Sequence, residues 1–182
     1  MADVATRTTP LGGVHGGSAS VQLTPAAPAE RLSLRAASGD VAALSSALGL
    51  ELPVRPKASV SAGGRTALWL GPDEWLVIDE GQGGLMAACA ASGALHSAVD
   101  VSHRNTAILV EGPRAAATIN AGCPLDLSTK AFPVGACTRT IFGKVEIVLL
   151  RAGEEAFRVE VWRSFSEYAF GLLSEGATDA VL

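Results

Sequence analysis

The chain has 182 residues, of which 48% are hydrophobic and 18% are charged. This length suffices for one domain with a buried core, and a charged share below the ~25% usual for globular proteins favours a surface partly covered by a partner. The formal charge is −4. Without a basic stripe to neutralise phosphates, nucleic acid is excluded as a partner.

The lack of a targeting signal and the pattern of the cysteines together predict a soluble, cytoplasmic protein. The first residues contain no apolar block of signal-peptide length. The apolar stretch 141–150, which contains Lys144 and Glu146, is far shorter than the ~20 residues that span a membrane, so no membrane association is expected. Cys89, Cys123 and Cys137 form no CxxC pair, which is typical of reduced cytosolic thiols.

Composition divides the chain into three parts. Residues 1–28 are rich in Pro, Gly and small polar residues, which predicts a flexible N-terminal arm that either frays or orders on a partner. Residues 29–176 form the expected single folded domain. Residues 177–182 are expected to be a C-terminal tail.

The first half of the domain alternates strands and helices. Leu32 and Leu34 alternate with polar residues, which predicts a half-buried strand over 30–35. A helix with Ser38 as its cap is expected to follow. Two β-rich runs, 67–70 and 75–78, flank a Gly-Pro turn and predict a hairpin, and the uncharged stretch 84–92 predicts a helix.

The second half predicts five strands and two helices. The strands are expected over 94–101, 105–110, 138–142, 145–151 and 156–162. One helix begins at Pro113 and ends near Gly122, and another covers 164–173. Neighbouring strands with few helices between them indicate an α+β domain with a largely antiparallel sheet and packed helices.

The residues that commonly carry catalysis or bind metals do not form a recognisable set. The stretch Gly12–Gly17 precedes no helix, so it cannot present helix amides to a nucleotide. His96 and His103 are seven residues apart, an odd spacing that places them on opposite faces of a strand. His15 lies in the arm. No metal site is therefore predicted.

Nucleophiles and carboxylates lead to the same interpretation. Cys137 has Arg139 as an electropositive neighbour, but a small, half-buried side chain is the simpler interpretation. The acidic pairs 73–74 and 154–155 look like solvated turns. Asp100 and Glu146 lie in apolar strands and need a hydrogen-bond partner or an outlet to solvent. No catalytic, cofactor-binding or metal-ligating residue is assigned to this chain.

An ordered series of short motifs resembles known proteins. The strings Asp100-Val101-Ser102-His103 and Gly112-Pro113-Arg114-Ala115 resemble elements of the glycine cleavage aminomethyltransferase, a folate-binding fold. Further elements extend the likeness to the gamma-subunit family of heterotetrameric sarcosine oxidase over about 30–175: they occur at 70–76, 122–127, 132–135, 137–140 and 163–165. Asp100 and Ser102 are expected to hold turns by bonding nearby backbone amides.

The resemblance implies an accessory subunit of a complex that oxidises sarcosine to glycine, with hydrogen peroxide and formaldehyde or 5,10-methylenetetrahydrofolate as further products. It implies a direct contact with the alpha subunit, and beta and delta subunits in the same complex. FAD, FMN, NAD and tetrahydrofolate are expected on those other subunits, with no cofactor in this chain. Residues 60–75 and the N-terminal arm are the expected contacts.

Two alternatives remain open from the sequence. A freestanding tetrahydrofolate-dependent aminomethyltransferase-like protein would use Glu146 as its folate-facing acid. A stand-alone binding module would need none of the other subunits. A Lys-Gly-Cys-Tyr element, by which the folate-binding iron-sulfur repair protein is recognised, does not occur in the chain.

Overall fold

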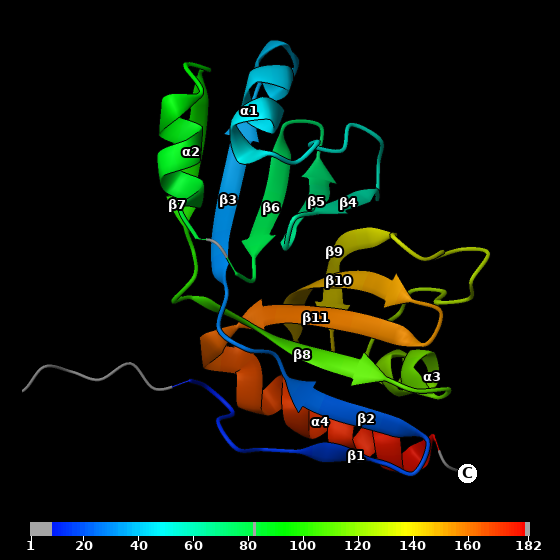
Figure 1. Cartoon of the computed structure of the whole chain (residues 1–182). Helices are drawn as coiled ribbons and strands as arrows, with labels where there is room; N and C mark the ends of the chain where they lie inside the picture. Colours follow the sequence, from blue (N-terminus) through cyan, green and yellow to red (C-terminus); the bar gives the residue numbers. More distant parts are fainter. Residues whose placement is uncertain (1–8, 82, 181–182) are drawn as a thin grey trace, which may run out of the picture.

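Two antiparallel sheets form the framework of the computed structural model, which describes residues 9–81 and 83–180 (Figure 1). Sheet A has six strands in the order β1-β2-β8-β11-β10-β9, and sheet B has five in the order β4-β5-β6-β3-β7. The strands are β1 (Gly16–Ser18), β2 (Val21–Pro25), β3 (Glu30–Ala36), β4 (Ser59–Ala62), β5 (Arg65–Gly71), β6 (Glu74–Asp79), β7 (His96–Asp100), β8 (Asn105–Glu111), β9 (Cys137–Phe142), β10 (Val145–Gly153) and β11 (Ala156–Trp162).

Sheet B packs one face against two helices, α1 (Val41–Leu48) and α2 (Leu85–Ala91). Leu32 and Leu34 of β3 lie fully buried in this core, as the alternating pattern predicts. The hairpin of β5 and β6 and the helix α2 are also confirmed. Ser38 does not cap α1: a short 3-10 helix, Ser38–Asp40, precedes it, and Asp40 takes the N-cap position without a side-chain cap bond.

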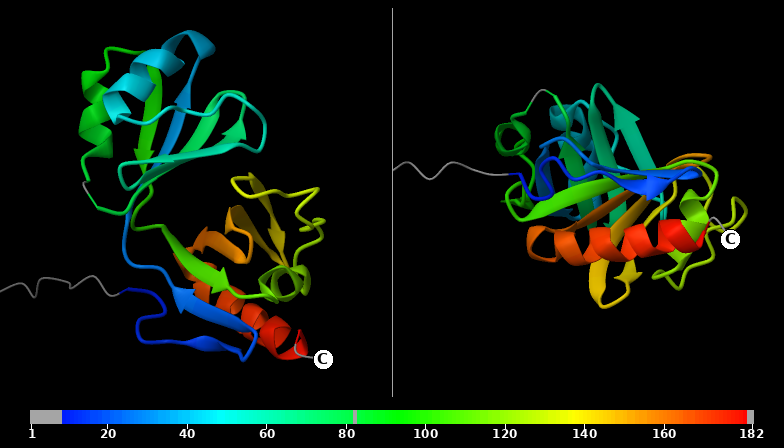
Figure 2. Two further views of the ribbon diagram at one scale, coloured as in Figure 1. Left: turned by 45° about the vertical axis from the view of Figure 1, so that its right-hand side comes forward. Right: turned by 90° about the horizontal axis from the view of Figure 1, so that it is seen from below.

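Sheet A packs one face against the helices α3 (Ala115–Asn120) and α4 (Ser166–Asp179). Figure 2 shows α4 running along this sheet. The predicted strands 138–142, 145–151 and 156–162 correspond to β9, β10 and β11. The α+β class and the antiparallel pairing of the strands are confirmed, but the strands form two sheets where a single one was expected. No helix in the described part of the chain is long and apolar enough to cross a membrane.

The chain path explains why the N-terminal prediction is wrong for residues 16–25. Sheet B is inserted between β2 and β8, which pair with each other in sheet A. Within β2, Val21 and Leu23 are buried in the sheet A core. This segment is therefore an integral strand pair and not a flexible arm. Its pairing partner β8 lies more than 80 residues later in the chain, so residues 16–25 carry no local signal of the pairing. Residues 1–8 lie outside the described part.

The predicted C-terminal tail is also corrected in part. Helix α4 continues to Asp179, beyond the predicted end at 173, and Ala177 is fully buried against sheet A. Gly176 allows this close packing: a Cβ there would lie 2.6 Å from the carbonyl oxygen of Thr118 in α3. Residues 181–182 lie outside the described part.

A third apolar cluster joins the two sheets. It contains Leu68, Leu76 and Ile78 from sheet B with Cys137, Val148 and Leu150 from sheet A, and also Val101. The backbone connects the sheets at the same place, since Ala58 and Ala136 form an antiparallel bridge. Both sheets therefore bury part of their second face against each other, and we call this region the inter-sheet junction.

Candidate functional site

The three thiols are buried and held in their neutral form where a shift is resolved. Cys89, Cys123 and Cys137 are free. Burial raises the pKa of Cys137 to about 12, although a backbone hydrogen bond with Trp69 opposes that rise, and burial also raises the pKa of Cys89. A nucleophile requires the thiolate. Cys137 therefore serves as a core residue of the inter-sheet junction, and Arg139 does not activate it.

The histidines and acids do not gather around a metal position. Among residues 9–81 and 83–180, no group of three His, Cys, Asp or Glu side chains has a metal-binding arrangement. The Nδ1 atom of His96 lies 2.8 Å from the carbonyl oxygen of Ala94. His15 and His103 are exposed and lie in different parts of the fold.

Asp100 and Ser102 hold the crossing from sheet B to sheet A. Asp100 binds a nearby backbone amide, as expected, whereas Ser102 binds the amide of a distant strand. The Oδ1 atom of Asp100 accepts hydrogen bonds from the backbone N–H and the hydroxyl of Ser102, at 2.8 and 2.5 Å. The Ser102 hydroxyl oxygen in turn accepts the backbone N–H of Arg31 at 2.9 Å. The motif thus fixes where β7 ends and β8 begins, which sets the position of one sheet relative to the other.

Glu74 corrects the prediction of a solvated acidic turn. Asp73 is exposed, but Glu74 is buried and receives hydrogen bonds from two arginines, Arg35 at 2.8 Å and Arg139 at 2.6 Å. The hydrogen bond from Arg139 lowers the pKa of Glu74, and the positive charges of Arg139 and Arg35 lower it further. Because Glu74 lies on β6 and Arg139 on β9, this ion pair connects the two sheets.

A second ionic connection crosses the junction, and the sequence analysis did not predict it. Glu160 of β11 accepts the Nε–H of Arg31 at 2.7 Å and the Nε–H of Arg158 at 2.7 Å. The side chains of Arg31 and Glu160 are 2% and 1% exposed. Arg158 also donates to Glu80 at 2.5 Å. This chain of charges, Arg31–Glu160–Arg158–Glu80, is buried except at Glu80, whose side chain is 58% exposed, and is hereafter called the buried ion network.

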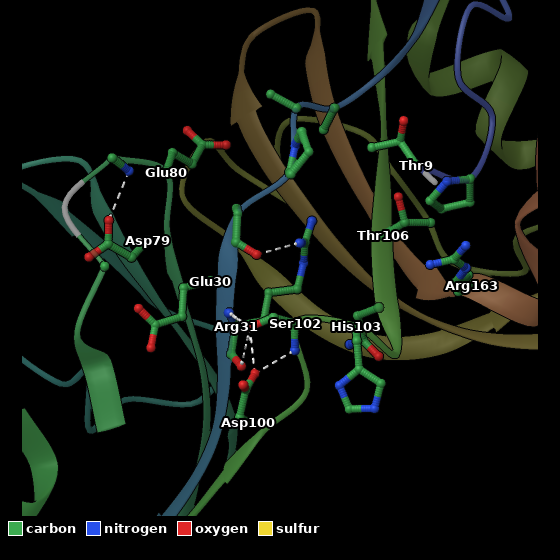
Figure 3. A pocket seen from close by; sticks show the side chains of 18 residues that line it. Thr9, Glu30, Arg31, Asp79, Glu80, Asp100, Ser102, His103, Thr106 and Arg163 are labelled. Atoms are coloured by element: carbon green, nitrogen blue, oxygen red, sulfur yellow. Dashed lines mark hydrogen bonds between the residues drawn. The ribbon is translucent and has the colours of Figure 1, made fainter. Parts of the chain in front are cut away.

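A cleft of about 530 Å³ opens beside the buried ion network (Figure 3). Its volume lies within the range of small-molecule sites. Much of its polar lining already has partners in the chain, since Arg31 binds Glu160 and Glu30 accepts the backbone N–H of Leu85 at 3.1 Å. Figure 3 shows Asp100, Ser102 and Arg31 joined by hydrogen bonds on this lining. Because Asp79 of sheet B and Thr106 of sheet A both line the cleft, it lies where the two sheets meet.

Glu146, the acid that a folate enzyme would use, is the second residue of β10. Its carboxylate is 3.6 Å from Arg139, and its side chain is 55% exposed. The cavity beside it, which Trp162 also lines, has a volume of about 40 Å³. That volume accommodates ordered water and is far below the several hundred Å³ of a ligand site.

Arg151 organises the loop between α3 and β9 and was also missed. Its guanidinium is 4.9 Å from the centroid of the Phe157 ring and donates to the carbonyl oxygens of Leu127 and Phe132, at 2.9 and 3.1 Å. Leu127 and Phe132 belong to two of the motifs in the ordered series. These motifs therefore shape the loop that leads into β9. The sequence did not predict this role of Arg151, because a single arginine in an apolar strand does not indicate which carbonyl groups it binds.

The arrangement as a whole positions one sheet on the other. The motif residues Asp100, Ser102, Glu74 and Arg139 all lie at the inter-sheet junction, and their polar atoms bind groups of this chain. Pairing of this kind stabilises a defined geometry of the two sheets.

Comparison with known structures first defines the class of fold. The glycine cleavage aminomethyltransferase T from Bartonella henselae superposes with a TM-score of 0.62 at 15% identity, covering 85% of this chain and 45% of that protein. This likeness concerns the fold alone. The chain thus has the aminomethyltransferase-like fold, at roughly half of that protein's length.

Closer relatives identify the family. The model of the sarcosine oxidase gamma subunit family matches residues 34–179. Curated gamma subunits from Corynebacterium sp. strain U-96 and Arthrobacter sp. are 31% and 32% identical, covering 90% and 88% of this chain and 82% and 81% of theirs. A chain of the heterotetrameric sarcosine oxidase from Corynebacterium sp. U-96, solved with pyrrole 2-carboxylate, superposes with a TM-score of 0.85 at 28% identity over 92% of this chain and 89% of that chain. The chain belongs to the sarcosine oxidase gamma subunit family.

Proposed function

We propose that this chain is an accessory subunit that assembles with the alpha subunit of a cytoplasmic, heterotetrameric sarcosine oxidase, together with beta and delta subunits. The observation that carries the proposal is the match to a heterotetrameric sarcosine oxidase over 92% of this chain and 89% of that chain. The three free, buried cysteines support a reducing compartment.

In this proposal the chain supplies structure and the other subunits supply the redox chemistry. FAD, FMN, NAD and tetrahydrofolate are assigned to those subunits. The support from this chain is that its carboxylates at the junction are paired with arginines and that its thiol Cys137 is held neutral. Leu68 and Trp75, part of the stretch 60–75 expected to contact the alpha subunit, are buried in this chain's own core, so the contact must use other side chains.

Co-purification tests the proposal. The chain is expressed with and without the alpha, beta and delta subunits of its own organism, and size exclusion is run while flavin absorbance is recorded. We expect the chain to elute with the yellow complex and to be colourless alone. Elution of the chain as a separate monomer in the presence of all three subunits would overturn the proposal. Tetrahydrofolate binding by the isolated chain, lost in Glu146→Ala, would then favour the freestanding transferase.

A further inference from the structure

The strongest unexplained surface lies at one end of sheet A, where aromatic side chains gather in the open. The chain has three tryptophans, one tyrosine and five phenylalanines. Of these, Trp162, Phe165 and Tyr168 are each 41% exposed. They follow one another through the end of β11 and the start of α4, a connection that lies beside the start of β8 in Figure 1.

The strand register places Trp162 beside polar and charged side chains of the sheet. Trp162 pairs with Asn105 of β8, and because Ile147 pairs with Val161, Glu146 of β10 lies opposite Trp162 on the same face. Ile141 of β9, which is 54% exposed, lies beyond Glu146 on that face. We call Trp162, Phe165 and Tyr168 the aromatic surface.

The aromatic surface is held in place by contacts within the chain. The rings of Trp162 and Phe165 stack with their centroids 6.1 Å apart, and the Arg104 guanidinium lies 5.1 Å from the centroid of the Trp162 ring. The hydroxyl of Tyr168 accepts the backbone N–H of Lys144 at 3.2 Å. Side chains that are ordered before binding lose little entropy when they bind, and exposed Trp, Tyr and Arg are the residues that dominate binding energies at protein interfaces.

The charges around the aromatic surface indicate the chemistry of its partner. Arg104 and Lys144 are exposed around it, and of the two carboxylates in this region, those of Glu146 and Glu167, Glu146 already lies near Arg139. On a chain with a formal charge of −4, this end of sheet A is thus locally cationic. Charge complementarity therefore favours a partner that brings carboxylates together with apolar side chains.

We propose that the aromatic surface docks an acidic, apolar segment of a neighbouring subunit of the sarcosine oxidase complex. This inference rests on the proposed function, because it assumes that the chain assembles with other subunits. It adds the place of contact and the kind of segment that binds there. The stacked pair Trp162–Phe165 supplies the apolar anchor, and Arg104 receives a carboxylate at its edge.

The experiment measures binding of the purified chain to the purified complex of the remaining subunits. In Trp162→Ala/Phe165→Ala we expect the Kd to rise about thirtyfold or more, the usual cost of removing a central aromatic anchor. The matched control is Leu95→Ala/Val99→Ala, which removes two exposed apolar side chains of the β7 region, 82% and 54% exposed. We expect its Kd to stay within about twofold of the unsubstituted chain. Circular dichroism and the urea midpoint of each variant verify folding.

A charge reversal tests the chemistry of the partner separately. We expect Arg104→Glu to weaken binding about tenfold at low ionic strength, with the difference shrinking as salt screens the pair. If the unsubstituted chain fails to bind, the proposed function is wrong. If it binds and Trp162→Ala/Phe165→Ala binds equally well, only the aromatic surface is wrong as the docking site. If the effect of Arg104→Glu on the Kd does not depend on salt, the proposal of an acidic partner is wrong. If Trp162→Ala/Phe165→Ala abolishes a dimer of the isolated chain but not binding to the complex, the aromatic surface binds a second copy of this chain instead.

Discussion

The two ionic connections between the sheets differ in their access to solvent. The buried ion network places Arg31 and Glu160 almost entirely out of water, whereas Glu74 meets Arg35 and Arg139, whose side chains are 55% and 38% exposed. Charges that water can reach are partly screened and lose little when separated. Charges inside the protein lose much more when one partner is removed. The same kind of bond therefore contributes very different stabilities at the two ends of one junction.

The largest effect is expected from neutralising the centre of the buried ion network. Glu160→Gln keeps the shape of the side chain but leaves Arg31 and Arg158 without their shared carboxylate. We expect the free energy of unfolding, measured in urea, to fall by about 3 kcal/mol. Glu155→Gln, in an exposed turn, is the control and should change it by less than about 0.5 kcal/mol. A loss in Glu160→Gln no larger than the control's would show that the network adds no stability.

The apolar part of the junction should rank next. Leu150 is buried between the sheets in the cluster that also contains Cys137 and Val148. Leu150→Ala creates a cavity, for which we expect a loss of about 2.5 kcal/mol in the same urea measurement. Leu95→Ala, at a site 82% exposed, should lose less than about 0.5 kcal/mol. If the two variants are equally stable, the sheets do not pack as one core.

A smaller, pH-dependent effect on stability is expected at the solvent-accessible ionic connection, in which Glu74 binds Arg35 and Arg139. Glu74→Gln should lower stability at pH 7 by about 1 kcal/mol, since solvent screens its arginine partners. The pKa of Glu74 is lowered from 4.5 in the folded chain by the Arg139 hydrogen bond, so its contribution is present above about pH 4.5 and is lost as pH falls through the lowered value. The two proteins should therefore converge in stability below pH 4.5. A gap that widens on acidification would contradict the ion pair.

The sequence predicts most elements but not the junction between them. Strand β3 was expected to be half buried because Leu32 and Leu34 alternate with Arg31, Ser33 and Arg35. The structure buries Leu32 against α1 and α2 and also buries Arg31 against sheet A. A polar alternate face is the usual mark of solvent exposure. Only the fold reveals that the polar faces of β3 and β11 meet and pair their charges.

The same limit applies to the N-terminal strands and to the candidate site. Val21 and Leu23 are two apolar residues in a Pro- and Gly-rich stretch. They pair with β8, which is separated from β2 in the sequence by all of sheet B. By contrast, the turn held by Asp100 could be predicted, because its hydrogen bond from the backbone N–H of Ser102 spans two residues. The bond that Ser102 accepts from the backbone N–H of Arg31 spans 71 residues and could not be predicted. Hydrogen bonds between residues close in the sequence could therefore be predicted, and contacts between distant segments could not.

Labelling of Cys137 provides the finest test of the comparison. Cys137 lies between the sheets with a pKa of about 12, so a thiol reagent at pH 8 should react only when the junction opens. With Cys89→Ala/Cys123→Ala as background, Cys137 is the single thiol. If opening separates both ionic connections, Glu160→Gln should speed labelling about 100-fold and Glu74→Gln about fivefold, in proportion to their expected losses of stability. Equal labelling rates in the two variants would mean that the thiol is exposed by a local movement of the Ala58 bridge, and the difference between the two ends of the junction would then concern stability alone.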